Sequence, residues 1–117
     1  MGSVVAFPVE RIQVEEIGRD DAIARIRAAL KQRSGKTWSV RGGRGTGWGW
    51  IDISAPPKRL DRFGAMSPED CELLGDLLDM GVAPYGVQIP ASTAYRVEYV
   101  DRAEGRPPRR TGTPYWD

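Results

Sequence analysis

The sequence predicts an α+β domain, in which a small, mainly antiparallel sheet is centred on a β-hairpin rich in glycine and tryptophan and flanked by about three helices. Residues 37–53 alternate apolar and polar side chains on both sides of a glycine run, as the strands of a hairpin do. Apolar residues recur at helical spacing in residues 20–33 and 68–80. The 117 residues, 40% hydrophobic and 28% charged, fit a single domain over residues 1–117.

The chain begins with an N-terminal segment, residues 1–19, that we expect to be extended. Its short β-like fragments are separated by Pro8, and proline is tolerated at sheet edges. A helix follows up to about residue 33, with Asp20 or Asp21 as its N-cap and Gly35 at its end. Its inward-facing residues are Ile23, Ile26 and Leu30.

The hairpin has one apolar face and one mixed face, because side chains alternate along a strand. The apolar face, against which the first helix is expected to pack, carries Trp38, Val40, Ile51 and Ile53. The mixed face carries Ser39, Arg41, Trp48, Trp50 and Asp52. This second face is the candidate functional surface.

The later elements follow from turn and capping signals. Residues 54–65 are expected to form a loop, since two successive prolines interrupt strand and helix. Ser67 is a good N-cap, and Pro68 stands at the first helical position of a helix that we expect to run to about residue 80 and to end at Gly81. A short strand is expected at residues 86–89.

Residues 92–104 fit two structures. Tyr95, Val97 and Tyr99 alternate with charged residues as in a strand. A helix fits as well, with Ser92 as N-cap and Gly105 at the stop position, and we prefer the helix. Residues 106–117 lack periodicity and are interpreted as a C-terminal tail.

Composition excludes several kinds of site. The chain has no histidine and one cysteine, which rules out an internal disulfide, a Cys/His zinc site and a Ser-His-Asp triad. Cys71 has no basic neighbour in sequence, so nothing indicates an activated thiol. We therefore expect no enzyme, no metal and no cofactor. The single cysteine, together with the absence of a signal peptide and of a long apolar run, favours a cytoplasmic location.

The glycine run at residues 42–47 matches neither nucleotide-binding fingerprint. A hairpin tip explains it better, because tight turns require positive φ. Beside it, Trp48 and Trp50, with Arg41 and Arg44, are candidates for contact with a partner, since aromatic rings and arginine dominate such contacts. The alternative is that the tail or a helix covers both tryptophans.

Charged clusters add further candidates. The helix after Ser67 carries an acidic group that fits a basic partner or an ordinary solvated face, namely Glu69, Asp70 and Glu72. Two basic clusters would suit phosphates, although surface charge usually serves solubility. They are Lys58, Arg59 and Arg62, and Arg106, Arg109 and Arg110.

The stretch IRAALKQRSGKTWSVRGGRGTGWGWIDI resembles the large polyvalent protein-associated domains that phages and conjugative elements carry. The later stretch GVQIPASTAYRVEYVDRAEG is similar to small phage and actinobacterial proteins that share this layout. The resemblance covers residues 22–53 and 86–105. It implies an accessory or anti-defence role, in which a small protein binds host immune machinery or nucleic acid. It carries no catalytic residue over to this chain.

Three functions are therefore compared. The favoured one is a non-enzymatic binding protein of phage or mobile-element origin that occludes a host protein, such as a CRISPR-type or other defence effector, through the hairpin and the acidic helix. The second is a nucleic-acid-binding module in which the tryptophans stack bases and the basic clusters hold phosphates. The third is a ligand pocket between hairpin and tail.

Overall fold

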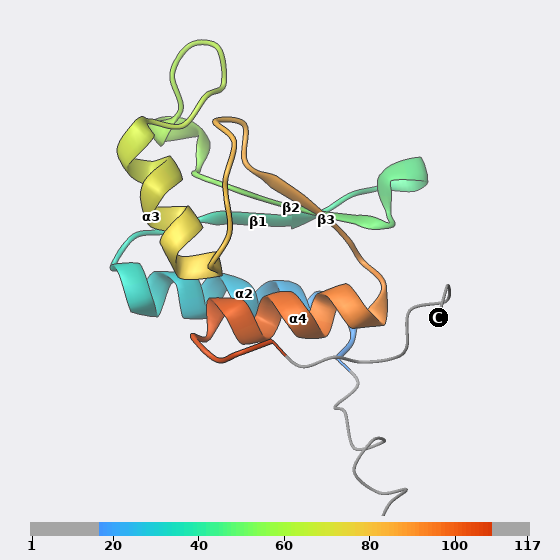
Figure 1. The fold of residues 1–117 in the computed structure, drawn as a ribbon. Helices are drawn as coiled ribbons and strands as arrows, with labels where there is room; N and C mark the ends of the chain where they lie inside the picture. Colours follow the sequence, from blue (N-terminus) through green and yellow to red (C-terminus); the bar gives the residue numbers. More distant parts are fainter. Residues whose placement is uncertain (1–16, 109–117) are drawn as a thin grey trace, which may run out of the picture.

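The structure is a computed structural model that describes residues 17–108 (Figure 1). Its elements are α2 (Arg19–Ser34), β1 (Ser39–Gly42), the 3-10 helix η2 (Gly45–Gly47), β2 (Trp50–Ser54), the 3-10 helix η3 (Pro57–Arg59), α3 (Pro68–Leu78), β3 (Val87–Pro90) and α4 (Thr93–Ala103). The strands form one antiparallel sheet in the order β1-β2-β3. The predicted α+β fold is confirmed. Most of the predicted N-terminal segment and tail lies outside the described residues.

The sheet has the apolar face that the sequence predicts. Its register places Val40 opposite Ile53 and Ile51 opposite Ile89, and all four side chains are buried. Trp38, which precedes β1, is also buried, and its ring nitrogen donates to the Ser34 hydroxyl at the end of α2. The first strand is therefore joined to the first helix by burial and by a satisfied indole N–H.

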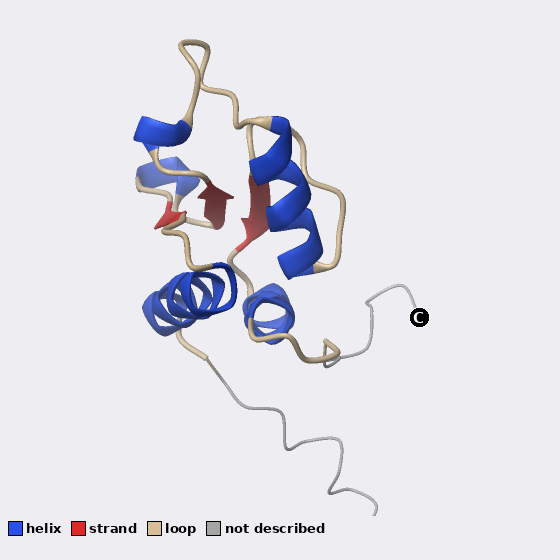
Figure 2. Cartoon of the chain, turned by 90° about the vertical axis from the view of Figure 1, so that its left-hand side faces the viewer, coloured by secondary structure: helices blue, strands red, loops and turns tan. Residues whose placement is uncertain are grey.

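Two helices cover this apolar face and a third flanks the end of the sheet. α2 and α4 lie side by side beneath the sheet in both views, and α3 stands beside the end of the sheet that is remote from the hairpin turn (Figures 1 and 2). Each contributes fully buried side chains to one core: Ile26 and Leu30, Val97 and Val100, and Leu74 and Leu78. Within residues 17–108, no helix packs on the other face of the sheet.

The N-cap predicted for the first helix is wrong. α2 begins at Arg19 with Gly18 as its N-cap, and the Ala22 N–H donates to the Gly18 carbonyl. Asp20 and Asp21 instead occupy the first turn, where a negative charge is favourable beside the positive end of the helix dipole. The predicted stop is confirmed, because Gly35 adopts φ 75° and donates its N–H to Lys31.

The predicted end of the second long helix is also wrong. The Ser67 hydroxyl accepts from the Asp70 N–H, as a serine N-cap should. However, the helix stops at Leu78, because Asp79 takes the left-handed conformation with φ 56°. The N–H groups of Asp79 and Met80 both donate to the Gly75 carbonyl, so the chain has already turned back before Gly81.

Residues 92–104 form a helix, as preferred, and the strand alternative is wrong. α4 buries Val97, Val100 and Ala103 on one side, and Gly105 follows it with φ 82°. The expected loop after β2 contains a single 3-10 turn, η3, with Pro57 at its start, where the missing proline N–H removes no helical bond.

Candidate functional site

The second face of the sheet is open and chemically mixed. The strand residues that point away from the helices are exposed or partly exposed, and we call them the outer sheet face: Ser39, Arg41, Trp50, Asp52, Ser54, Gln88 and Pro90. The register aligns Arg41, Asp52 and Gln88 in one row across the three strands, and Trp50 lies opposite Pro90. The Gln88 amide donates to the Asp52 carboxylate over 3.0 Å.

Both candidate tryptophans are exposed. Trp48 keeps 57% of its surface accessible and Trp50 keeps 42%. The alternative that a helix covers them is therefore wrong, and most of the tail, which the same alternative named, lies outside the described residues. Arg41 and Arg44 are exposed as well. Arg41 lies on the outer sheet face with Trp50, whereas Trp48 lines a hollow with Arg19 and Arg96, near the starts of α2 and α4. The structure therefore does not bring all four residues onto one face.

The two tryptophans do not lie on one strand, which corrects the sequence prediction. β2 begins at Trp50, and Trp48 follows the 3-10 turn η2 at the hairpin tip, residues 43–49. Arg19, the first residue of α2, fixes this tip. Its guanidinium lies 4.4 Å from the centre of the Trp48 ring, and it donates to the Trp48 carbonyl over 2.7 Å and to the Gly43 carbonyl over 2.9 Å.

Close packing explains two glycines of the run. A Cβ on Gly42 would collide with the Arg19 guanidinium, and a Cβ on Gly43 would collide with the Gly47 carbonyl. These positions therefore need glycine because side chain and backbone approach them closely. This geometry agrees with the interpretation of the run as a hairpin tip.

Asp70 does not belong to the exposed acidic surface that the sequence predicts. Its side chain is buried and accepts from Arg59 over 2.9 Å and from Lys36 over 3.1 Å. Burial alone would raise the pKa of the Asp70 carboxyl, but the hydrogen bonds and charges of these two cations outweigh it and lower that pKa. Glu69 and Glu72 are exposed, as predicted.

The three basic residues after β2 also differ in their contacts and exposure. Arg59 is held by Asp70 and lies 4.9 Å from the centre of the Trp38 ring, so it fastens α3 to the start of the sheet. Lys58 and Arg62 are exposed. Arg59 is therefore not the free phosphate ligand that the sequence predicts.

The predicted nucleic-acid contacts are also dispersed. The loop that carries Lys58 and Arg62 lies at the end of the sheet opposite the hairpin tip (Figure 1). In the second basic cluster, Arg106 forms ion pairs with Asp101 over 2.7 Å and with Glu104 over 2.6 Å. Arg109 and Arg110 lie outside the described residues.

Sequence reasoning missed Arg19, Gln88 and Pro90. No local signal identifies Arg19, because it contacts a residue 29 positions away. Gln88 and Pro90 were detectable, since their alternation with Val87 and Ile89 places them on the outer face. Among residues 17–108, no helix is long and apolar enough to cross a membrane, and no acid or cysteine cluster has the makings of a metal site.

Comparison with protein-family models, with curated proteins and with solved structures gives no match for this chain. The resemblance to large polyvalent protein-associated domains therefore stays a prediction.

Proposed function

We propose that this chain is a non-enzymatic binding protein that contacts another macromolecule through its hairpin tip and outer sheet face. The observation that carries the proposal is the exposure of two indole rings on one hairpin, Trp48 at 57% and Trp50 at 42%, in a segment that also exposes Arg41 and Arg44. Tryptophan and arginine are the residues that most often dominate binding energy at interfaces. Because these side chains are exposed, they are not part of the protein's own core.

The hairpin tip is held in place before any partner arrives. Arg19 stacks on Trp48 and donates to two carbonyls of the tip, and the Ala91 N–H donates to the Gly49 carbonyl over 2.7 Å. A surface that is already ordered loses less conformational entropy when it binds. This favours a specific, rigid contact over a loop that orders on binding.

We propose a protein as the partner, in preference to nucleic acid. Asp52 lies in the centre of the outer sheet face and Gln88 donates to it, so this surface is not uniformly positive. The exposed Lys58 and Arg62 are at the other end of the sheet (Figure 1). A phosphate backbone attracts continuous positive charge, which the hairpin face lacks.

The identity of the partner follows from the resemblance alone. A domain of the phage or mobile-element type would bind a host defence protein, of the CRISPR type or another, and inhibit it by occluding its working surface. The resemblance suggests this inhibitory role, and the exposed hairpin face is suited to it.

The test is capture of a partner from a lysate of the host bacterium, with the wild type compared with Trp48→Ala and Trp50→Ala. Phe63→Ala is the matched control, because Phe63 is 70% exposed and lies in the loop at the opposite end of the sheet. With the purified partner, each tryptophan substitution should weaken binding roughly thirty-fold, as expected for the loss of about 2 kcal/mol at a dominant contact. Equal recovery of every partner by all variants would remove the proposed site.

The salt dependence of binding distinguishes a protein partner from a nucleic-acid partner. Nucleic-acid binding should weaken steeply between about 50 and 200 mM salt, whereas a contact centred on indole rings should change little. A labelled single-stranded oligonucleotide that binds with a steep salt dependence, and that releases on Trp50→Ala, would favour the nucleic-acid-binding module instead.

A further inference from the structure

A groove lies at the end of the molecule remote from the hairpin tip. One wall is α3 and the other is the chain that returns from it toward β3, and between them lies a shallow, open hollow of about 670 Å³. The apolar floor is formed by Met66, Cys71, Met80 and Val82. The rim carries Glu72, Asp76 and Asp79. We call this feature the acidic groove.

The two walls are fixed by the backbone. The left-handed turn at Asp79 reverses the chain, and the Met80 N–H donates to the Gly75 carbonyl over 3.0 Å. A Cβ at Gly75 would lie 2.8 Å from the Met80 carbonyl oxygen, so the glycine permits this close return. Further along, the Met66 N–H donates to the Pro84 carbonyl over 2.8 Å. The shape of the groove is therefore fixed by backbone hydrogen bonds of the fold.

The rim acids are unfavourable for the helix that carries them. Glu72, Asp76 and Asp79 are exposed, and none has an ion-pair partner within residues 17–108. Glu72 and Asp76 are four residues apart, which is the spacing of direct repulsion on a helix surface. Asp76 and Asp79 stand near the negative end of the helix dipole. The last turn of α3 has no basic residue of its own, and Arg33 and Arg102 donate to its carbonyls without pairing with these carboxylates.

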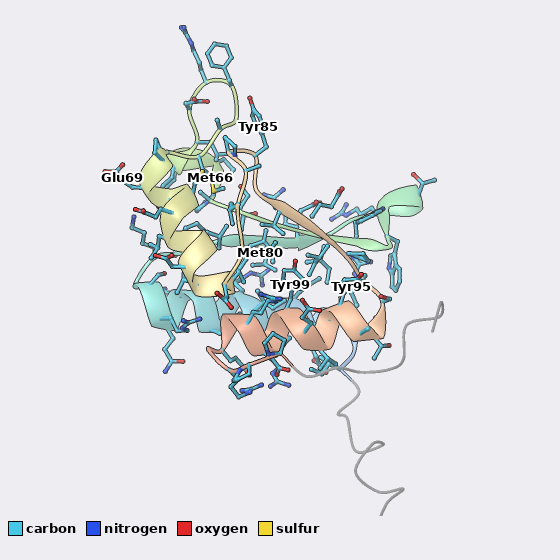
Figure 3. The ribbon with its side chains drawn as sticks, viewed as in Figure 1. Met66, Glu69, Met80, Tyr85, Tyr95 and Tyr99 are labelled. Carbon is cyan, nitrogen blue, oxygen red and sulfur yellow. The ribbon has the colours of Figure 1, made fainter. Side chains whose placement is uncertain are left out.

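The groove also has no cation of its own, since no lysine or arginine lines it. Tyr99, on α4, donates its hydroxyl to the Met80 sulfur over 3.3 Å and holds one side of the floor. In Figure 3, Met66 and Met80 lie on the side of α3 that faces the returning chain, whereas Glu69 lies on the far side of that helix. The apolar residues and the rim acids thus line the same hollow, whereas Glu69 does not line it.

We infer that the acidic groove binds a basic, amphipathic peptide segment of a partner protein. An apolar side chain of that segment packs on the methionine and valine floor, and its lysines or arginines pair with the rim acids. Methionine suits such a floor because its flexible, polarisable side chain adapts to different apolar shapes. The positive charges relieve the repulsion between the rim acids and complement the helix dipole. Nucleic acid is disfavoured here because the rim is negative.

The test uses a fluorescent amphipathic peptide of lysine and leucine, titrated with the full chain and followed by anisotropy. The double variant Glu72→Gln with Asp76→Asn should bind it roughly tenfold more weakly, since two exposed ion pairs are lost. The matched control is Glu69→Gln, an acid of the same helix outside the groove, which should bind like the wild type. A peptide in which serine replaces every leucine should bind the wild type more weakly than the lysine and leucine peptide does, because it has no apolar side chain to pack on the groove floor.

Amide shifts in NMR locate the contact. The peptide should shift Gly75 and Gly81 and leave Gly45 and Gly47 at the hairpin tip unchanged. Trp50→Ala should bind the peptide normally, so that failure here and failure of the proposed hairpin interface are separate results.

Three results would overturn the inference. The first is equal binding by the double variant and the wild type. The second is equal binding of the leucine and serine peptides, which would mean general ionic attraction. The third is displacement of the probe by a peptide with the sequence of residues 109–117, which would identify the protein's own chain as the occupant.

Discussion

The clearest prediction concerns Asp70, the buried carboxylate that joins α3 to two distant cations. Its side chain is only 4% exposed and accepts from Lys36 and Arg59. The change Asp70→Asn keeps the shape of the side chain and removes its charge. It leaves both cations beside a neutral amide in a buried position.

The expected cost lies between two limits. Removing one member of a fully buried ion pair costs about 3–5 kcal/mol, whereas a surface pair contributes up to about 1 kcal/mol. Lys36 and Arg59 keep 45% and 23% of their side-chain surface exposed, so water can replace part of the lost interaction. We expect Asp70→Asn to lower the free energy of unfolding by about 2–3 kcal/mol at neutral pH.

The pH dependence identifies the charge as the cause. The pKa of Asp70 in the folded protein is lowered from its ordinary value of 3.8. A lowered carboxyl pKa stabilises the fold above the unfolded-state pKa, and this stability is lost as pH falls through the folded pKa. The difference between wild type and Asp70→Asn should therefore be constant from about pH 8 to 5 and should shrink below about pH 4.

The assay is urea unfolding at several pH values, with Glu69→Gln as the control. Glu69 precedes Asp70 on the same helix but is exposed, so its substitution should change the free energy of unfolding by less than about 0.5 kcal/mol. The electrostatic explanation is refuted if the difference in the free energy of unfolding between wild type and Asp70→Asn is the same at about pH 3 as at about pH 7. It is also refuted if the Asp70→Asn variant is as stable as the control.

Three further predictions test the tip, the helix ends and the groove. Gly43→Ala should destabilise the protein by about 1–3 kcal/mol because its methyl group meets backbone, whereas Gly49→Ala, with no atom within 4 Å of the added Cβ, should cost less in thermal unfolding. Arg33→Met removes donation to three carbonyls at the ends of α3 and α4 and should cost about 1–2 kcal/mol in urea unfolding. Asp76→Lys should raise stability by about 0.3–1 kcal/mol and abolish binding of the lysine and leucine peptide. If Gly43→Ala leaves the stability unchanged, the close approach at the tip is contradicted, and the same result for Arg33→Met contradicts its role at the helix ends. If Asp76→Lys leaves the peptide affinity unchanged, the contact between the peptide and the rim is contradicted.

Local patterns were sufficient to predict the fold. Alternation placed Val40, Ile51 and Ile53 on the buried face, and the serine and glycine signals located α3 and α4 to within a few residues. The helix end at Asp79 escaped prediction, because a non-glycine residue takes the left-handed conformation there, which few residues other than asparagine and aspartate do readily.

The site was harder to predict because it depends on contacts between distant residues. The exposure of Trp50 follows from strand alternation, but the position of Trp48 depends on Arg19, which is 29 residues away. Likewise, Arg59 and Asp70 read as members of a basic and an acidic cluster, and only their approach to 2.9 Å turns both into structural residues. Sequence identifies charged groups, whereas tertiary contacts decide which of them remain available.

The acids of α3 make this distinction clearest. Asp70 stands in the first turn, where the helix dipole favours it, and two cations satisfy it. Asp76 stands toward the other end, where the dipole disfavours it, and its carboxylate has no ion-pair partner within residues 17–108. If acids served only the stability of the helix, they would be concentrated in its first turn. The carbonyls at this end of α3 serve the fold, because Arg33 and Arg102 donate to them, whereas the exposed carboxylate of Asp76 beside the apolar groove suits the positive partner that we propose.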